Sequence, residues 1–221
     1  MEIHRIWIDN QWLEYDLIYK NIKSLYMKVE QGRLVVKAPL LTPLNFIENS
    51  IIKYQNRIIK QINQFQPYAL YQDHGYVMIF HKQYSLVVRD LQKRQCQIHN
   101  DSLYVYHHDI EKTVEKFLKQ KLLDYLEERI IYYLATSFDL DMPHIEVKKY
   151  KGRWGSCYYK EQRVSFHLSL IHLEKNLIDY VIVHELTHFL QPNHSKQFYL
   201  EIEKRMPDYK TRQQRLKEKH I

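Results

Sequence analysis

The segment YVIVHELTHFL, residues 180–190, decides which fold the chain can adopt. Its apolar residues follow the spacing of one face of a helix, so we expect a helix over residues 176–190 that Pro192 ends. His184 and His188 are four residues apart and therefore lie on the same face of that helix. Their imidazole nitrogens can bind one cation, at about 2.0–2.1 Å each if the cation is zinc.

The residues from His184 to His188 form the pattern His-Glu-x-x-His, in which two histidines bind a metal and the glutamate acts as a general base. Glu185 is turned by about 100° from His184 around the helix axis. This rotation keeps its carboxylate out of the ligand pair but next to the open position of the metal. We therefore expect Glu185 to accept a proton from a water molecule that the metal activates.

A third ligand is needed because a catalytic zinc ion has three protein ligands and one open position. His194 follows His184 by ten residues, the offset found in the longer metzincin pattern, although the glycine of that pattern is missing. Pro192 and Asn193 favour a sharp reversal of the chain after the helix, which would return His194 to the metal. Glu201 is the alternative third ligand. We prefer His194 because imidazole is a favoured zinc donor.

The composition is that of a globular protein with a basic charge balance. The 221 residues include 33 Lys and Arg against 26 Asp and Glu, a formal net charge of +7. A positive field favours acidic partners such as nucleic acids and nucleotides. Cys96 and Cys157 are far apart and no Cys-x-x-Cys occurs, which excludes a zinc finger and fits a reducing, cytoplasmic location. We find no signal peptide and no apolar run of about 18 residues, so we expect no membrane span.

The order of the predicted elements indicates an α+β fold, with a β-rich N-terminal part packed with a zincin-like, metal-binding helical C-terminal part. We place a β-rich N-terminal region with one helix in residues 1–108 and the zincin-like catalytic region in residues 109–221, with one continuous domain as the alternative. The sequence shows no internal repeat. The expected strands lie within residues 1–40 and at 76–79, 84–88, 103–106, 145–149 and 163–168, with a loop at 153–157, and the other expected helices lie at 42–65, 109–136, 195–205 and 208–219.

Four groups of residues together resemble a known family. They are Arg153–Cys157, Tyr180–His188, Asn193–Ser195 with Phe198, and Pro207–Lys210. This combination resembles the YgjP-like metallopeptidase-domain family, small zincins that are similar to the WLM and SprT-like proteins. The resemblance implies a zincin fold in which an N-terminal sheet region packs on a helical metal site.

The resemblance also implies roles for individual residues. It assigns His184, His188 and His194 as ligands of one Zn²⁺ ion and Glu185 as the general base. Two departures from the family pattern concern the next strand and the turn before it. The family has a glycine in the hairpin at residues 158–162, which is absent here, and an asparagine where this chain has His167.

These observations predict a zinc-dependent hydrolase, a metallopeptidase with a three-histidine site and a glutamate base. An extended peptide or protein substrate would pair with the strand at 163–168 or with the strand near Lys148. Arg153 and Tyr209 are candidate contacts for the substrate, or for the oxyanion that forms during the reaction.

Two other functions stay open. A metal-dependent nucleotide pyrophosphohydrolase would use the same site to attack phosphorus, and a basic protein attracts nucleotides, but the sequence has no glycine-rich phosphate loop. A DNA-associated protease or nucleic-acid-binding module, with weak nucleic-acid association, is suggested by residues 195–221, which carry eight Lys or Arg against four acids. The sequence leaves the oligomeric state open.

Overall fold

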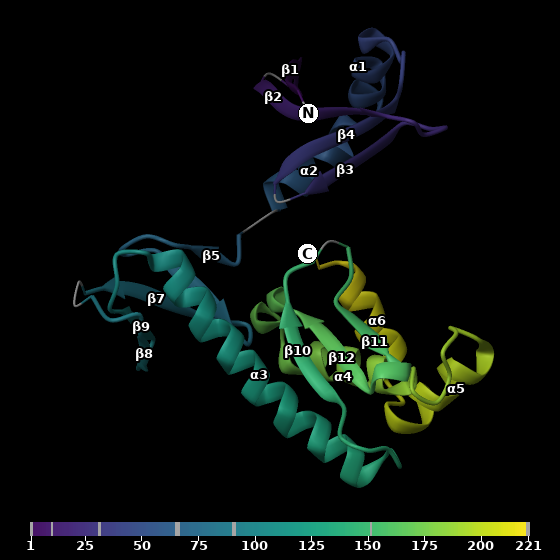
Figure 1. The fold of residues 1–221 in the computed structure, drawn as a ribbon. Helices are drawn as coiled ribbons and strands as arrows, with labels where there is room; N and C mark the ends of the chain where they lie inside the picture. Colours follow the sequence, from purple (N-terminus) through teal and green to yellow (C-terminus); the bar gives the residue numbers. More distant parts are fainter. Residues whose placement is uncertain are drawn as a thin grey trace. The chain divides into compact units, whose positions relative to one another are not determined.

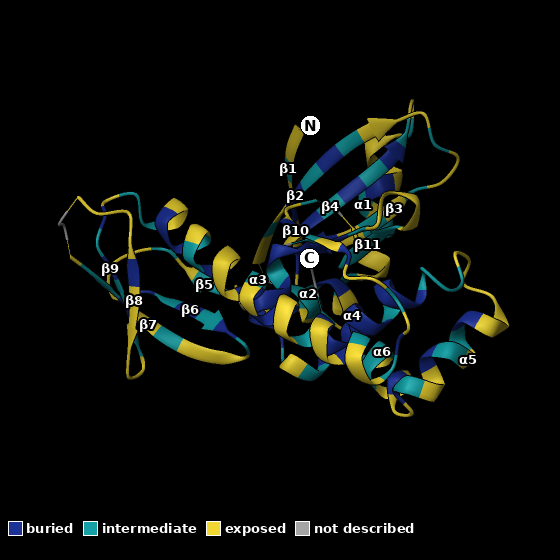
Figure 2. Ribbon diagram, turned by 60° about the horizontal axis from the view of Figure 1, so that its bottom comes forward, coloured by how far each residue is buried: buried dark blue, intermediate teal, exposed yellow. Residues whose placement is uncertain are grey.

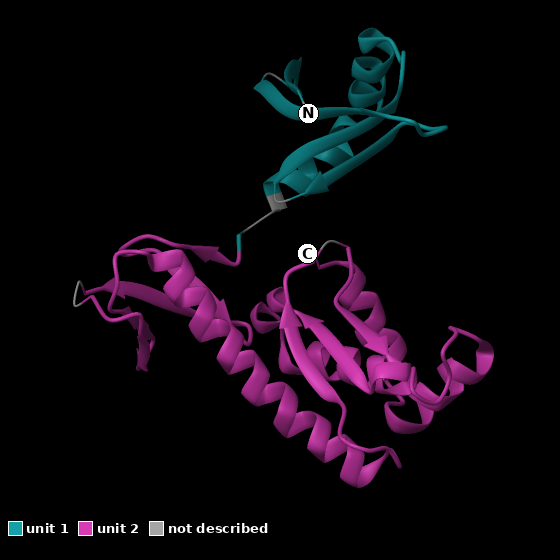
Figure 3. Cartoon of the chain, viewed as in Figure 1, with its two compact units in different colours: residues 1–67, 220 teal, residues 68–219, 221 magenta. Residues whose placement is uncertain are grey.

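The computed structural model describes residues 2–9, 11–30, 32–64, 67–89, 92–150 and 152–219. The chain forms two compact units, residues 1–67 and 68–219 (Figure 3). The described residues contain three sheets and several helices (Figure 1). Each of the sheets has parallel and antiparallel strand pairs, and the predicted α+β class is confirmed. The boundary predicted between residues 108 and 109 lies inside the second unit, and residues 220 and 221 of the predicted catalytic region lie outside the described residues.

The first unit contains a four-stranded sheet and two helices. The strand order is β1-β2-β4-β3, in which β2 and β4 are parallel and the other neighbours are antiparallel. Leu34 and Val36 of β4 share a buried core with Ile47 and Ile51 of α1, as expected for a sheet with one face covered. The elements are β1 (Glu2–Ile8), β2 (Gln11–Lys20), β3 (Tyr26–Glu30), β4 (Arg33–Pro39), α1 (Leu44–Lys53) and α2 (Gln55–Gln64).

The helix predicted at residues 42–65 is two helices, so the prediction of one helix in the N-terminal region was wrong. Tyr54 separates them, with φ −109° and ψ 13°, outside the helical range. Ile51 and Ile58 on either side of the break are both buried in the same core. Because the apolar spacing continues across Tyr54, the periodicity could not show the break. Phe65, the last residue of the prediction, lies outside the described residues.

The second unit begins with a sheet that repeats the topology of the first. Strands β6, β7, β9 and β8 pair in the same order and directions as β1, β2, β4 and β3, and a helix follows in both units. Residues with positive φ also occupy the same turns, Asp9 and Phe80 in the first hairpin and Gly32 and Asn100 in the last. The internal repeat that the sequence did not show is therefore present in the backbone. The elements are β5 (Ala69–Leu70), β6 (Tyr76–Ile79), β7 (Lys82–Val88), β8 (Cys96–His99), β9 (Ser102–Val105) and α3 (Ile110–Thr136).

The rest of the second unit is a three-stranded sheet with helices. The strand order is β10-β12-β11, so β12 is the middle strand, parallel to β10 and antiparallel to β11. Strand β11 lies in the segment that we predicted as a loop. None of the described helices has both the length and the apolar composition that a membrane crossing requires. The elements are β10 (His144–Lys148), β11 (Gly155–Tyr158), β12 (Arg163–His167), α4 (Lys175–Thr187), α5 (Lys196–Arg205) and α6 (Tyr209–Lys217).

A buried charged cluster joins α3 to α4. Asp179 of α4 accepts hydrogen bonds from Nε and Nη2 of Arg129, at 3.1 and 2.8 Å, and from the Tyr125 hydroxyl at 2.8 Å. The Tyr133 hydroxyl donates to the same carboxylate at 3.3 Å. A buried carboxylate needs such a set of donors because it has lost its water. Since α4 carries the His-Glu-x-x-His segment, the cluster holds that segment against the long helix α3.

Asp179→Ala should lower the free energy of unfolding by about 3 kcal/mol, because it leaves the largely buried Arg129 guanidinium without a counter-charge. Urea denaturation measures the loss. The matched control Asp124→Ala removes an exposed carboxylate of α3 that bonds Gln120, and it should change the stability by less than about 0.5 kcal/mol. Equal losses in the two variants would contradict the anchoring role of Asp179.

Candidate metal centre

Helix α4 supplies two of the three candidate ligands from a buried position. The helix is buried along most of its length (Figure 2). His184 lies in its last turn, and His188 follows Thr187 with φ −65° and ψ −19°, which are still helical values. Both imidazoles therefore project from the same side. The helix that we predicted to reach Leu190 ends at Thr187, and a hydrogen-bonded turn continues to Leu190.

The chain then reverses and brings His194 back to His184. Ser195 caps the next helix, α5, because its hydroxyl accepts a hydrogen bond from the Phe198 amide at 3.3 Å. A serine in this position fixes where a helix begins. His194 directly precedes the cap, and its Nε2 atom lies 3.0 Å from Nε2 of His184.

The three imidazoles converge on one point. One ring nitrogen from each of His184, His188 and His194 lies within 4.8 Å of the other two. Nδ1 of His188 lies 3.3 Å from the Gln191 carbonyl oxygen, which can only accept, so Nδ1 donates and Nε2 keeps its lone pair for a metal. Within the part of the chain that the structure describes, no other set of His, Cys, Asp or Glu side chains converges in this way.

The spacing and protonation of these nitrogens fit a single cation. Two nitrogens that bind zinc at about 2.05 Å with tetrahedral angles are about 3.3 Å apart, close to the 3.0 Å between Nε2 of His184 and Nε2 of His194. Burial, with the rings of His188 and His194, lowers the pKa of His184 to about 3, and burial also lowers the pKa of His188. His184 and His188 are therefore neutral near pH 7, which is the form that binds a metal.

The ring of Phe198 packs against all three imidazoles. Phe198 is fully buried, and its ring centroid lies 5.0 Å from that of His184, 4.6 Å from that of His188 and 4.7 Å from that of His194. A close-packed aromatic ring in a core has little freedom to move, so it restricts the positions of its neighbours. The sequence indicated Phe198 only as part of a motif, and its positioning role became visible with the structure.

The carboxylate of Glu185 is buried beside the histidines. Burial raises its pKa to about 8, although the Arg153 guanidinium and a hydrogen bond from the Cys157 amide act in the opposite direction. A carboxylate with a raised pKa holds a proton more strongly than one in water. Glu185 is therefore a stronger base than an exposed glutamate.

Gly155 leaves the space that the Glu185 side chain occupies. A Cβ atom at residue 155 would lie 2.5 Å from Oε1, 2.7 Å from Cγ and 2.8 Å from Cδ of Glu185. Non-bonded carbon atoms normally stay about 3.5 Å apart or more. The glycine of the Arg153–Cys157 motif therefore has a steric function, because β11 can lie this close to Glu185 only without a side chain at residue 155.

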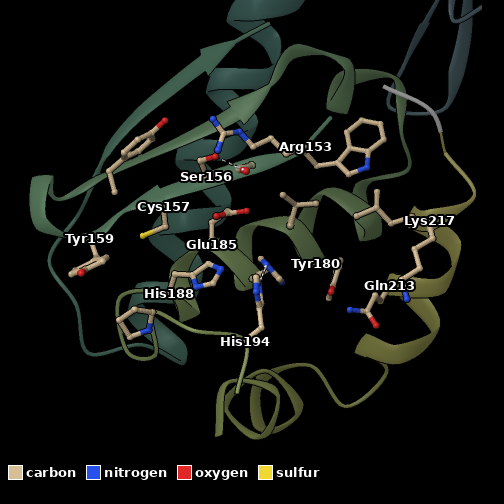
Figure 4. Close-up of a pocket in the computed structure, with 17 residues that line it drawn as sticks. Arg153, Ser156, Cys157, Tyr159, Tyr180, Glu185, His188, His194, Gln213 and Lys217 are labelled. Carbon is tan, nitrogen blue, oxygen red and sulfur yellow. Dashed lines mark hydrogen bonds between the residues drawn. The ribbon is translucent and has the colours of Figure 1, made fainter. Parts of the chain in front are cut away.

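The histidines and Glu185 line a pocket of about 570 Å³ in the second unit (Figure 4). Its other walls come from residues 153–159, from Tyr180 and Val181 of α4, and from α6. Arg153 is among the lining residues, as the sequence predicted. Tyr209 is not among the described residues that line the pocket, since it is buried and its ring stacks on that of Tyr199, with centroids 6.1 Å apart.

Glu201, the alternative third ligand, is engaged elsewhere. Its carboxylate accepts hydrogen bonds at 2.7 Å from both Arg205 and Lys204, and these bonds lower its pKa to about 2. His167 is not among the described residues that line the pocket. It is buried in β12, and its Nδ1 accepts a hydrogen bond from the Ser169 amide at 3.1 Å. Of the two candidates for third ligand, the structure brings only His194 to His184 and His188.

Several parts of the pocket were missing from the predicted site, among them Tyr180, strand β11 and the α6 residues Gln213, Leu216 and Lys217. Tyr180 lies one helical turn before His184, so the four-residue spacing could have placed its ring on the ligand side of α4. Strand β11 was harder to find, because Gly155 and Ser156 favour turns more than strands.

Comparison with known proteins identifies one family and remotely similar solved structures, among them two metallopeptidase zymogens. The family model described as YgjP-like, metallopeptidase domain, matches residues 23–219. The crystal structure of the metallopeptidase zymogen of Pyrococcus abyssi abylysin is 20% identical over 41% of this chain and 90% of that chain, with a TM-score of 0.39. The zymogen of Methanocaldococcus jannaschii jannalysin is 19% identical over 42% of this chain and 94% of that chain, with a TM-score of 0.38. No curated protein matches the chain.

Gly155→Ala should lower the free energy of unfolding by about 1–3 kcal/mol, the usual range for overpacking a core. Glu185→Ala removes Oε1, Cγ and Cδ, the three atoms that the new Cβ atom would meet, so the loss in the double variant should be smaller than the sum of the two single losses. Urea denaturation of the wild type, both single variants and the double variant gives the coupling energy between the two sites. A coupling energy near zero would contradict the steric relation between Gly155 and Glu185.

Proposed function

The chain belongs to the YgjP-like metallopeptidase-domain family, and from this premise we propose that it is a zinc peptidase with a three-histidine site. His184, His188 and His194 would hold one Zn²⁺ ion, and Glu185 would be the general base. Membership of the family makes the chain a metal-dependent peptidase, while the metal, its ligands and the base are our assignment. The observation that supports it most is the convergence of three imidazole nitrogens within 4.8 Å, beside a buried carboxylate.

Each residue has a role that follows from its surroundings. A cation held by three imidazoles supplies a Lewis acid, which acidifies water and polarises a carbonyl group. Glu185 accepts the proton of the attacking water and passes it to the amine that leaves. The Cys157 amide fixes the direction of the Glu185 carboxylate, and Gly155 allows it to lie there. Arg153 lines the same pocket and remains our candidate for contact with the oxyanion.

The substrate would bind along β11, a strand that we did not predict. We expected the strand at 163–168 or the one near Lys148 to pair with a peptide. The first is β12, the middle strand, whose two edges are already occupied by β10 and β11. The second is β10, which has a free edge but contributes none of the described residues that line the pocket. All residues of β11, Gly155–Tyr158, line it.

The free edge of β11 offers main-chain groups to an extended peptide. The His167 amide donates to the Trp154 carbonyl at 2.8 Å, so these two residues form a hydrogen-bonded pair. Along an antiparallel strand every second residue bonds to the neighbouring strand, and the residues between direct their main-chain groups to the other side. Ser156 and Tyr158 then face β12, whereas Gly155 and Cys157 direct their main-chain groups away from it. The Cys157 amide already donates to Glu185, so the Gly155 amide and the Cys157 carbonyl are available to a substrate.

The two alternative functions have less support. For a nucleotide pyrophosphohydrolase the pocket offers two basic side chains, Arg153 and Lys217, but it lacks the glycine-rich loop whose amides hold phosphates and has the edge of a strand in its place. Binding to nucleic acid needs unpaired basic side chains. In the basic segment 195–221, however, five side chains already form ion pairs with carboxylates: Lys204, Arg205, Lys210, Arg212 and Arg215.

Glu185→Gln should keep zinc bound but lower kcat by about 100-fold or more, because an amide cannot accept the proton and a general base contributes about 10²–10⁴-fold. Zinc is measured by mass spectrometry after dialysis. Turnover is measured with a mixture of synthetic peptides whose cleavage products are separated and identified.

His188→Ala provides the comparison. With two imidazoles left, the protein should lose zinc and turnover together. Unchanged turnover in Glu185→Gln would contradict the role of the base. Retention of one zinc ion with wild-type affinity in His188→Ala would contradict the ligand assignment.

A further inference from the structure

The pocket carries more positive than negative side chains. Among the described residues that line it, Arg153 and Lys217 are basic, and Glu185 is the one acid. The Glu185 carboxylate is buried beside the three histidines, where it accepts a hydrogen bond from the Cys157 amide. A ligand that enters the pocket therefore meets a positive field, which favours negatively charged groups.

Lys217 differs from the other basic side chains of α6. It is exposed and lines the pocket, and it forms no ion pair with any described residue. The others each have a carboxylate partner: Lys210 with Glu203 at 3.5 Å, Arg212 with Asp208 at 2.8 Å and Arg215 with Glu174 at 2.5 Å. The ammonium group of Lys217 is thus the one positive group of this helix that a ligand in the pocket can pair with.

The direction of β11 relates Lys217 to one end of a bound peptide. Figure 4 shows Lys217 and Gln213 on one side of the histidines and Tyr159 on the opposite side. Tyr159 directly follows the last residue of β11, so Lys217 lies towards the first residue, Gly155. A peptide that pairs antiparallel with β11 runs from Tyr158 to Gly155. Its residues after the scissile bond therefore approach Lys217.

This end of the pocket combines apolar walls with hydrogen-bonding groups. Trp154 and Leu216 supply the apolar surface. One N–H of the Gln213 amide donates to the Tyr180 hydroxyl, which leaves the second N–H for a ligand, and both side chains line the pocket. An ammonium group beside an amide matches a carboxylate, because one supplies charge and the other supplies a directed N–H.

We propose that Lys217 and Gln213 form a subsite for a carboxylate on the C-terminal side of the scissile bond, an inference that rests on the proposed peptidase function. The carboxylate can be the side chain of Asp or Glu, or the free end of a short peptide, since both offer the same charge and the same acceptor atoms. The preferred substrates are then peptides with Asp or Glu just after the cleaved bond, or peptides whose C-terminus lies just after that bond.

The test starts from a peptide that the full-length protein, loaded with one equivalent of zinc, cleaves in a mixture. One pair of derivatives carries Glu or Gln directly after the scissile bond, with an amidated end. In a second pair the residue directly after the scissile bond is neutral and is the last residue of the peptide. One member of this pair has a free C-terminal carboxylate and the other a C-terminal amide. The acidic member of at least one pair should have a kcat/KM about fivefold higher, the effect of an exposed ion pair of about 1 kcal/mol.

Variants at residue 217 connect this preference to the lysine. In Lys217→Gln the ratio of acidic to neutral kcat/KM should fall to about one, and in Lys217→Arg it should persist, because the charge is kept. Lys210→Gln is the matched control, since it removes a positive charge from the same helix outside the pocket lining as described, and it should leave the ratio as in the wild type.

Binding provides a second measurement that needs no turnover. Calorimetric titration of the same peptides into Glu185→Gln should show the acidic preference, and Lys217→Gln in that background should abolish it. An equal ratio of acidic to neutral kcat/KM in the wild type and Lys217→Gln would overturn the subsite. The same holds if the acidic preference in binding persists in Glu185→Gln after Lys217→Gln is added. A zinc-loaded wild type that cleaves no peptide would instead overturn the proposed function, and the titrations would then decide whether the carboxylate site exists.

Discussion

The reversal of the chain between α4 and α5 is the constraint on which the candidate metal centre depends. A helix can place His184 and His188 on one face, but six more helical residues would carry His194 about 9 Å further along the axis. The helix ends at Thr187, and the cap at Ser195 starts the next helix in a new direction. The buried ring of Phe198 then contacts all three imidazoles, so the packing of α5 and the geometry of the ligands are linked.

A second constraint acts from the sheet side, where β11 approaches α4. The absence of a side chain at Gly155 lets the Glu185 carboxylate lie against the strand, and the Cys157 amide donates to it. The same strand has a free edge along the pocket. One short strand thus orients the proposed base and supplies the proposed binding edge, while the Asp179 cluster anchors the helix of His184 to α3.

The sequence predicted those parts of the fold that repeat a pattern over several turns. The apolar spacing located α3 and α4, the short helical stretches expected at 195–205 and 208–219 correspond to α5 and α6, and the three histidines whose spacing we noted lie together in the structure. The sequence could not show the break at Tyr54, because apolar spacing continues on both sides. It also could not show β11, whose glycine is there for a contact with a residue 30 positions away. Such contacts have no local signal.

The repeated sheet topology was hidden for a related reason. The two copies share only the alternation that any half-buried strand has, and their turns use chemically different residues, Asp9 in one copy and Phe80 in the other. Backbone direction and strand order are therefore more similar between the copies than the side chains are. For Tyr209 the sequence signal was clear but did not correspond to a place in the pocket. The residue belongs to a sequence motif, but its ring packs against Tyr199 and it is not among the described residues that line the pocket.

X-ray absorption at the zinc edge of the loaded wild-type protein tests the three-histidine centre most directly. Three imidazoles predict nitrogen or oxygen neighbours at about 2.0–2.1 Å, the multiple-scattering pattern of about three histidine rings, and no sulfur. Cys157 lines the same pocket, but its sulfur is not part of the set of ligand atoms that converge, which agrees with the absence of a sulfur neighbour. A sulfur neighbour at about 2.3 Å, or a shell of six oxygen atoms without imidazole scattering, would contradict the convergence of His184, His188 and His194 on one ion.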